Sequence, residues 1–235
     1  MHSQAPPSPR THSGRIVRRS FPLLPSMLLV LSSLSLSPPR ALAGPDPGPS
    51  LGARMVEAAR ELLGQPYQFG GRLKRAGEGI DCQGLLFYAA ERVGRCGWRS
   101  FSVMPTESIP RGELGRSVEG LSPVATADLD TARLQPGDVL WLLYAAENPA
   151  EPSIAELGED EVWVWHTALY AGDGRFLHAD PFGGKVIEEP LVPFLEGYGY
   201  AGVWVTRMTA GPAPHRCRKH AKMPRPAPRP EGPSP

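Results

Sequence analysis

The stretch GIDCQGLLFYAAERVG, residues 79–94, places Cys82 directly after an aspartate and at the front of an apolar run. Asp81 is a favoured helix N-cap residue, and Gly94 is favoured just past a helix C-terminus. The stretch therefore predicts a helix over about residues 82–94. Residues at helical spacing mark the face that packs on the core: Cys82, Leu86, Ala89 and Val93.

Cys82 has two interpretations in this position. A small buried cysteine can simply begin a core helix. A cysteine in the first helical turn can instead be a nucleophile, because unpaired N–H groups and the helix dipole favour a thiolate there. The second interpretation predicts a pKa below the free-cysteine value of about 8.5, although burial on the apolar face acts against it.

The chain has three cysteines, so one disulfide would leave one free thiol. Cys82 and Cys96 lie on and just past the expected helix, about 20 Å apart along its axis, whereas a disulfide allows a Cα separation of about 7 Å. Cys217 could pair with Cys96 and leave Cys82 free, but the sequence alone does not choose among the pairings.

Two of the six histidines, His166 and His178, lie between the two ends of the chain. Both fall in VWVWHTALYAGDGRFLHAD, residues 162–180, which predicts two strands around a Gly-Asp-Gly turn. A three-residue loop that pairs Ala171 with Arg175 places both histidines on one face of the hairpin. A loop of even length would place them on opposite faces.

A free thiol and a pair of histidines are the groups that thiol-dependent hydrolysis of an amide requires. An imidazole removes the thiol proton, and a third polar group fixes the tautomer and orientation of that imidazole. The developing oxyanion needs donors, for which the backbone N–H of Cys82 is one candidate. Tyr67, on the preceding glycine-rich loop, is a second candidate, with simple packing as its alternative role.

Residues 1–43 have the pattern of a secretory signal peptide. Four arginines and no acid precede the apolar run FPLLPSMLLVLSSLSLS, and ALA at residues 41–43 is an A-x-A cleavage site. We therefore expect an exported protein, periplasmic or extracellular, with no stable membrane anchor after cleavage; an uncleaved anchor is the alternative. The pair Arg18 and Arg19 resembles a twin-arginine signal, with ordinary export as the other route.

The other end, residues 209–235, is rich in proline and basic residues, which predicts a disordered tail. The chain has 25 Lys and Arg and 24 Asp and Glu; residues 1–43 hold five of the bases, and the tail holds six bases and one acid. The remaining 14 bases and 23 acids give residues 44–208 a net charge near −9. This acidic balance argues against a nucleic-acid partner.

Residues 44–50 read as a proline-rich linker, and residues 51–208 as one domain. Helix signals over about residues 51–63 and the cysteine helix come first, and residues 95–133 carry mostly loop and turn signals. Strands follow in LQPGDVLWLLY, in the histidine hairpin, in GGKVIEEP and in GYAGVWVTRM. This order predicts an α+β fold, with N-terminal helices packed on a central antiparallel sheet of about five strands.

Three blocks together resemble the motifs of the NlpC-type cell-wall peptidases: GQPYQFGG with DCQGLLFYAAERVG, then LQPGDVLWL, then HTALYAGDGRFLHAD. The resemblance covers about residues 51–207. It implies a papain-like fold and a thiol endopeptidase that cuts the peptide stems of bacterial peptidoglycan, commonly next to D-glutamate. It implies Cys82 as nucleophile, His166 as base, His178 as the orienting residue and Tyr67 as an oxyanion donor, with Asp81 in support. No metal or organic cofactor is implied.

The sequence departs from the family pattern after the cysteine, where Gln83 replaces the usual serine. We expect Gln83 to face the substrate and Gly84 to leave room for a substrate backbone. Asp180, opposite His166 in the expected hairpin, is a third candidate to face the substrate. The acidic insertion at residues 145–160 precedes the His166 strand and is expected to border the cleft.

Two other functions fit the same residues. The first is an amidase or acyltransferase that uses the Cys/His chemistry on another amide or ester. The second is a non-catalytic wall-binding module of the same fold. The presence of the complete set of Cys82, His166 and His178 argues against this second function.

Overall fold

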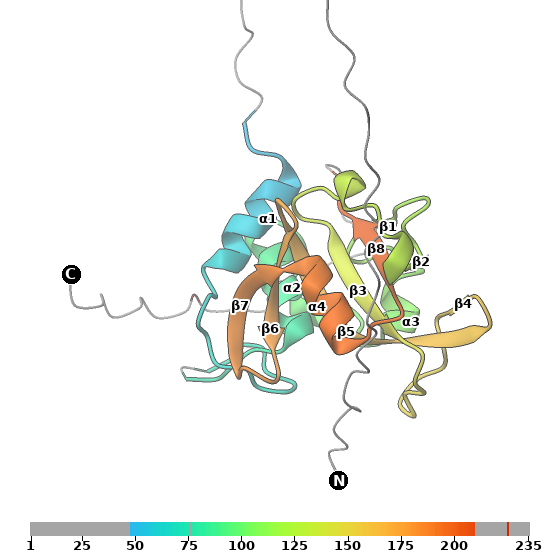
Figure 1. Ribbon diagram of the computed structural model, residues 1–235. Helices are drawn as coiled ribbons and strands as arrows, with labels where there is room; N and C mark the ends of the chain where they lie inside the picture. Colours follow the sequence, from blue (N-terminus) through green and yellow to red (C-terminus); the bar gives the residue numbers. More distant parts are fainter. Residues whose placement is uncertain (1–47, 76, 210–224, 226–235) are drawn as a thin grey trace, which may run out of the picture. The chain divides into compact units, whose positions relative to one another are not determined.

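The computed structural model describes residues 48–75, 77–209 and 225 (Figure 1). Contacts within the chain divide it into Met1–Pro45 and Asp46–Pro235, and the first unit lies wholly outside the described residues. The signal peptide, most of the linker and nearly all of the tail also lie outside them and stay sequence-based predictions. Among the described residues, no helix has the length and apolar character needed to cross a membrane.

Two helices with side-chain caps form the N-terminal layer. α1 spans Leu51–Arg60, and the Ser50 hydroxyl accepts a hydrogen bond from an N–H of its first turn at 3.1 Å. α2 spans Cys82–Arg92, with the Asp81 carboxylate as its N-cap. Beyond its end, Gly94 has a φ of 85°, the left-handed conformation that favours glycine after a helix. The two helix predictions are therefore confirmed.

The other helical elements are short and flank the sheet. They are α3 (Pro105–Ser108), α4 (Leu191–Tyr198) and the 3-10 turns η1 (Trp98–Ser100), η2 (Thr126–Asp128) and η3 (Thr131–Arg133).

The described sheet is antiparallel throughout and has eight strands rather than about five. Its main path runs β1-β8-β3-β5-β6-β7, with β2 also on β8 and β4 also on β5. The additional strands β1, β2 and β4 have two or three residues each, too few for an alternating apolar pattern to reveal them in the sequence. The strands are β1 (Arg116–Ser117), β2 (Val124–Ala125), β3 (Val139–Tyr144), β4 (Ala155–Leu157), β5 (Asp160–Gly172), β6 (Arg175–Asp180), β7 (Lys185–Pro190) and β8 (Gly202–Arg207).

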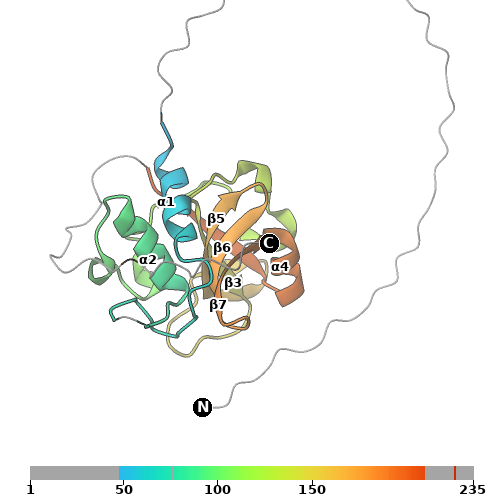
Figure 2. The same ribbon diagram turned by 90° about the vertical axis from the view of Figure 1, so that its left-hand side faces the viewer.

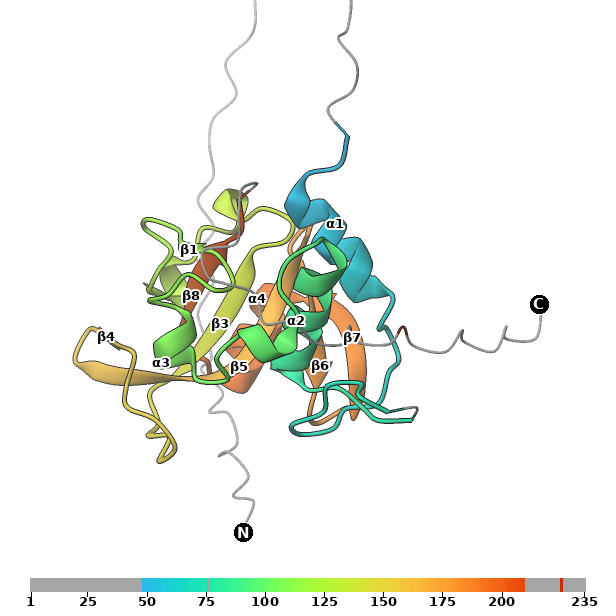
Figure 3. The same cartoon turned by 180° about the vertical axis from the view of Figure 1, so that it is seen from behind.

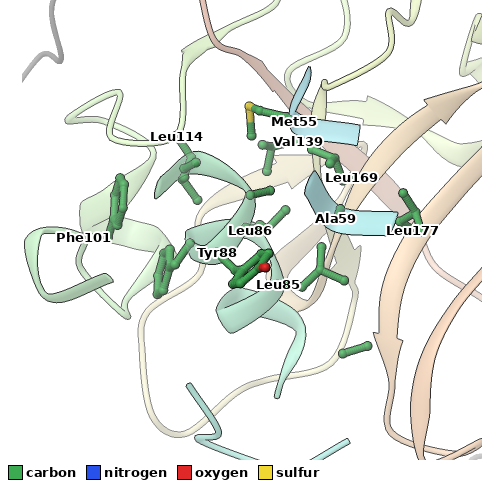
Figure 4. Packing of buried hydrophobic residues seen from close by; sticks show 14 of the residues in the cluster. Met55, Ala59, Leu85, Leu86, Tyr88, Phe101, Leu114, Val139, Leu169 and Leu177 are labelled. Carbon is green, nitrogen blue, oxygen red and sulfur yellow. The ribbon is translucent and has the colours of Figure 1, made fainter. Parts of the chain in front are cut away.

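Helices cover both faces of the sheet: α1 and α2 lie on one face and α4 on the other (Figures 2 and 3). Because side chains alternate along a strand, each strand contributes to two cores. Leu169 of β5 and Leu177 of β6 pack with α1 and α2 (Figure 4). Their neighbours Tyr170 and Phe176 belong to the second core, together with residues of α4.

The β5–β6 hairpin differs from the expected one at its turn. Arg175 pairs with Gly172 rather than with Ala171, and a two-residue turn joins the strands. Both turn residues, Asp173 and Gly174, have positive φ angles, as a tight hairpin turn requires. A bulge at Ala171 then restores the expected register, in which Leu169 pairs with Leu177. The observed architecture confirms the α+β prediction.

Candidate active site

Asp81 joins the start of α2 to the glycine-rich loop that precedes it. Its Oδ1 accepts a hydrogen bond from the Gly84 N–H at 2.6 Å, and its Oδ2 accepts one from the Gly70 N–H at 3.0 Å. The carboxylate also forms an ion pair with the Arg72 guanidinium, and both side chains are buried. Asp81 therefore fixes the position of Cys82, the first residue of α2.

Tyr67 lies on this loop near the thiol. Its backbone N–H donates to the Gly184 carbonyl at 2.8 Å, which ties the loop to the turn between β6 and β7. Burial, the Cys82 thiolate and the Asp81 carboxylate together raise the pKa of Tyr67 to about 12. The phenol therefore stays protonated at neutral pH and is able to donate a hydrogen bond.

The two residues after Cys82 interact with the protein itself. Gln83 Oε1 accepts from the Arg72 guanidinium at 3.3 Å, and its Nε2 donates to the Val103 carbonyl at 2.7 Å. Gly84 is buried, and a Cβ added there would lie 2.6 Å from the Gly71 carbonyl oxygen. The room expected beside Gly84 for a substrate backbone is therefore filled by the glycine-rich loop.

Cys82 carries a free thiol, whereas Cys96 is disulfide-bonded. Burial raises the pKa of Cys82, and the Asp81 carboxylate raises it further; the hydroxyl and N–H of Thr167 and the N–H of Gln83 act in the opposite direction. The sequence-based expectation of a lowered pKa is thus wrong, because desolvation outweighs the donors around the sulfur. At neutral pH the resting group is a thiol.

Thr167 links the two halves of the site, because it lies at the thiol and directly follows His166 in β5. Its hydroxyl is buried and has no hydrogen-bond partner of standard geometry in the described part of the chain. The hydroxyl hydrogen is therefore available to a charge that develops on the sulfur.

His166 and His178 meet on the α4 side of the sheet. His166 Nε2 lies 2.8 Å from His178 Nδ1, and the two rings are nearly perpendicular at 85°. His178 is fully buried and contacts the ring of Phe194 in α4 with a centroid separation of 5.0 Å. Burial lowers the pKa of His166 to about 4, and burial together with His166 lowers the pKa of His178. Both rings are neutral at pH 7.

Glu189 of β7 extends this chain of contacts, and no pattern in the sequence had marked it as a site residue. Its Oε1 lies 2.7 Å from His178 Nε2. The preceding residue, Glu188, points to the other face of the sheet and pairs with Arg60 of α1. Only the register of β7 against β6 decides which of these two adjacent acids reaches the histidines.

Asp180 has a structural role that is visible in its contacts. Its Oδ1 accepts from the Phe182 N–H at 2.8 Å, and its Oδ2 accepts from the Gly183 N–H at 2.7 Å. The carboxylate therefore shapes the turn after β6, next to the loop that carries Tyr67. The acidic insertion forms β4 and pairs with β5 before that strand reaches His166.

The predicted site residues thus fall into two groups. Tyr67, Asp81 and Cys82 gather at the start of α2, and His166 and His178 gather under α4. Thr167 connects the groups, and no hydrogen bond joins Cys82 to His166 directly among the described residues. The β5–β6 ladder ends at the pair Leu169–Leu177, so the two strands are not paired at the level of the histidines. In the described ranges, no cluster of His, Cys, Asp and Glu is arranged to hold a metal ion.

The chain is similar to several known proteins. No protein-family model matches the sequence. A probable endopeptidase of Corynebacterium glutamicum (strain R) is 30% identical over 141 residues, which make up 60% of this chain and 48% of that protein. The gamma-DL-glutamyl hydrolase of Bacillus subtilis (strain 168) is 27% identical over 57% of this chain and 24% of that protein. The chain thus spans about half the length of the first relative and about a quarter of the second.

Solved structures that match part of the chain include NlpC1 from Trichomonas vaginalis, with a TM-score of 0.45, 21% identity and coverage of 68% of this chain and 45% of that one. Another is the peptidoglycan hydrolase RipB from Mycobacterium tuberculosis, with a TM-score of 0.42, 24% identity and coverage of 68% and 66%. The motif blocks resemble those of the NlpC-type peptidases, and the curated relatives are named an endopeptidase and a hydrolase, as that resemblance implies. The chain itself has a capped cysteine helix packed on an antiparallel sheet, which is the order of layers that the sequence predicted.

Proposed function

We propose that this NlpC-type chain is a cysteine endopeptidase that hydrolyses amide bonds in the peptide stems of bacterial peptidoglycan, next to D-glutamate. One observation carries the proposal: a free thiol at a helix N-terminus lies beside Thr167, the residue that follows a buried, hydrogen-bonded imidazole. The name of the gamma-DL-glutamyl hydrolase supports the choice of a bond next to D-glutamate.

In this proposal the reaction starts from a neutral thiol and a neutral imidazole. His166 accepts the proton of Cys82 as the sulfur attacks the carbonyl carbon of the scissile amide. Starting from a neutral pair follows from burial, which raises the pKa of the thiol and lowers that of the imidazole. The sulfur of Cys82 and the ring of His166 are expected to come within hydrogen-bond distance when substrate binds, because catalytic hydrogen bonds are commonly long in unbound enzymes.

In this proposal two donors stabilise the oxyanion that forms on the carbonyl oxygen. The backbone N–H of Cys82 is in the first turn of α2, where it has no acceptor within the helix. The Tyr67 phenol is the second donor, because it stays protonated at neutral pH. Their combined effect is to stabilise the tetrahedral intermediate relative to the bound amide.

His166 then returns the proton to the leaving amine, the C–N bond breaks, and the acyl group stays on Cys82 as a thioester. A water molecule attacks the thioester carbonyl while His166 accepts its proton; the C–S bond then breaks, the carboxylic acid forms, and His166 returns the proton to the leaving sulfur. His178 keeps the base oriented through both steps. Such a substrate lies outside the cytoplasmic membrane, which agrees with the signal peptide expected at residues 1–43.

Digestion of purified peptidoglycan, followed by mass analysis of the released fragments, tests the proposal. The wild-type protein should release peptides that end next to D-glutamate, and Cys82→Ser should release none. Turnover of simple amides or esters without release of stem peptides would favour an amidase or acyltransferase. Binding to the polymer without any cleavage would favour a non-catalytic wall-binding module.

A further inference from the structure

Glu189 belongs to a continuous chain of hydrogen-bonding groups that begins at His166. The two contacts are 2.8 Å between His166 Nε2 and His178 Nδ1, and 2.7 Å between His178 Nε2 and Glu189 Oε1. In the β6–β7 ladder His178 pairs with Ile187, so Glu189 is its diagonal neighbour on the same face. The geometry is therefore set by the sheet register and not by a flexible loop.

The rings in this chain cannot turn freely. His178 is fully buried between Phe176 of its own strand, at a centroid distance of 4.7 Å, and Phe194 of α4. His166 is nearly buried and also contacts Phe194. Because packing fixes the rings, the remaining freedom of the chain is the position of the protons on the four ring nitrogens.

A carboxylate accepts hydrogen bonds and cannot donate them, and a neutral imidazole carries one N–H and one bare nitrogen. If Glu189 is ionised, His178 must carry its proton on Nε2, which leaves its Nδ1 bare. His166 must then donate from Nε2, and its Nδ1 becomes the bare nitrogen. With the opposite arrangement, His166 Nδ1 would carry a proton and could not accept one.

We propose that Glu189 is a positioning residue, which acts through His178 to hold His166 in the tautomer whose Nδ1 is the free base atom. The proposal rests on the proposed function, and it adds a fourth member to the set of Cys82, His166 and His178. The side chain of Glu189 has its hydrogen-bond contact with His178 and, within the described part of the chain, none with the thiol. Its effect passes entirely through the imidazole of His178.

Protonation of Glu189 would reverse the direction of the hydrogen bonds between Glu189, His178 and His166, because a carboxylic acid can donate to His178 Nε2. His178 would then donate from Nδ1 to His166 Nε2, and the base atom would be lost. Burial and Asp180 raise the pKa of Glu189, and Arg175 opposes them. Tyr198 in α4 interacts with both Asp180 and Glu189, and Tyr200 before β8, which contacts Phe194, interacts with Tyr144, Cys82, Tyr198 and Asp180.

Glu189→Gln is the informative variant, because its amide has nearly the same shape but can either accept or donate. The matched control is Glu188→Gln, which removes the same charge one residue away on the opposite face of β7. Nitrogen-15 NMR of the histidine rings, assigned with His166→Asn, reports the tautomers without any substrate. We expect an unprotonated Nδ1 on His166 in the wild type and in Glu188→Gln, and a mixture of tautomers in Glu189→Gln.

Kinetics on stem peptides give the second readout. We expect Glu189→Gln to lower kcat by about tenfold to hundredfold, by analogy with the loss of groups that orient metal-bound histidines in other proteins, with little change in KM. The acidic limb of its pH profile should move to lower pH, because Glu189 no longer titrates. Glu188→Gln should keep both the rate and the profile of the wild type.

A protonated His166 Nδ1 in the wild type, or identical ring spectra in the wild type and Glu189→Gln, would overturn the proposal. So would equal losses of kcat in the two variants. Since the ring spectra need no turnover, a wild-type protein with the expected tautomers but no peptidase activity would contradict the proposed function and leave the tautomer assignment standing.

Discussion

Asp81 and Arg72 form an ion pair that is buried beneath the start of the cysteine helix, with side-chain exposures of 9% and 6%. The same carboxylate accepts two backbone hydrogen bonds, one from the helix and one from the glycine-rich loop. Loss of the arginine would leave a buried negative charge with only its backbone donors. The position of Cys82 therefore depends on an interaction that the helix signal alone does not reveal.

We expect Arg72→Leu to lower the free energy of unfolding by about 3 kcal/mol or more, because an uncompensated buried charge is left behind. Arg60→Leu is the matched control, since Arg60 pairs with Glu188 and Glu57 in a more exposed setting. Its cost should be about 1 kcal/mol or less. Urea unfolding at neutral pH measures both values, and equal losses in the two variants would contradict a special role for the buried pair.

Local patterns in the sequence predicted much of the fold around the site. The N-cap at Asp81 and the glycine after the helix gave α2 nearly its observed bounds. The even spacing of His166 and His178, together with an expected three-residue loop, predicted that both side chains lie on one face. They do so, although the turn between the strands has two residues instead of three. The bulge at Ala171 compensates for the shorter turn, and a bulge has no alternating pattern by which it could be anticipated.

The parts of the site that escaped prediction depend on contacts between distant segments. Glu188 and Glu189 are chemically identical neighbours, and the pairing of β7 with β6 alone assigns one to Arg60 and the other to His178. The proximity of Thr167 to the thiol likewise needs the packing of α2 on β5. The sequence predicts a lowered pKa for Cys82, whereas the structure raises it, because a sequence shows the helix terminus but not the depth of burial.

We expect Gly84→Ala to destabilise the protein by about 2 kcal/mol, because the added methyl would meet the Gly71 carbonyl at 2.6 Å and Ile80 at 2.7 Å. Gly197→Ala in α4 is the control, since no atom lies within 4 Å of the added group. That change should be neutral or stabilising by up to about 1 kcal/mol. Thermal unfolding distinguishes the two, and a harmless Gly84→Ala would show that the loop can move away from the helix.

The reactivity of the thiol should reflect its surroundings. We expect the rate of Cys82 alkylation to rise with a midpoint above the free-thiol pKa, because burial and Asp81 oppose the thiolate. Thr167→Val should move the midpoint still higher, since it removes a donor, whereas Thr167→Ser should keep it. Cys96 is disulfide-bonded and should not react under non-reducing conditions. Alkylation with a midpoint below the free-thiol value would contradict this account.

The proposed roles predict a ranking of the histidine variants. We expect Cys82→Ala and His166→Ala each to abolish cleavage of stem peptides, because each removes a group that handles the reacting atoms. His178→Ala should retain more activity than His166→Ala, since His178 orients the base and carries no proton to the substrate. Circular dichroism serves as the folding control. Near-normal turnover by either of the first two variants would end the assignment of nucleophile and base.

The buried histidine pair should also make stability depend on pH. Burial lowers the pKa of His166 to about 4 and also lowers the pKa of His178, whereas the pKa of a histidine in the unfolded chain is about 6.5. Between these values the unfolded chain binds more protons than the folded one, so the free energy of unfolding falls as the pH drops from about 6.5 toward 4. Each histidine contributes a slope of up to about 1.4 kcal/mol per pH unit.

The carboxylates change the free energy of unfolding mainly below this pH range, or in the direction opposite to the histidines. The lowered pKa of Glu188 contributes stability that is lost as the pH falls below about 4.5 and through the folded pKa, and the raised pKa of Glu189 acts against the histidine effect. The double variant His166→Gln, His178→Gln should therefore flatten the dependence between pH 6.5 and 4, as followed by urea unfolding at a series of pH values. An equally steep dependence in the double variant would mean that groups other than the buried pair set the acid sensitivity of the fold.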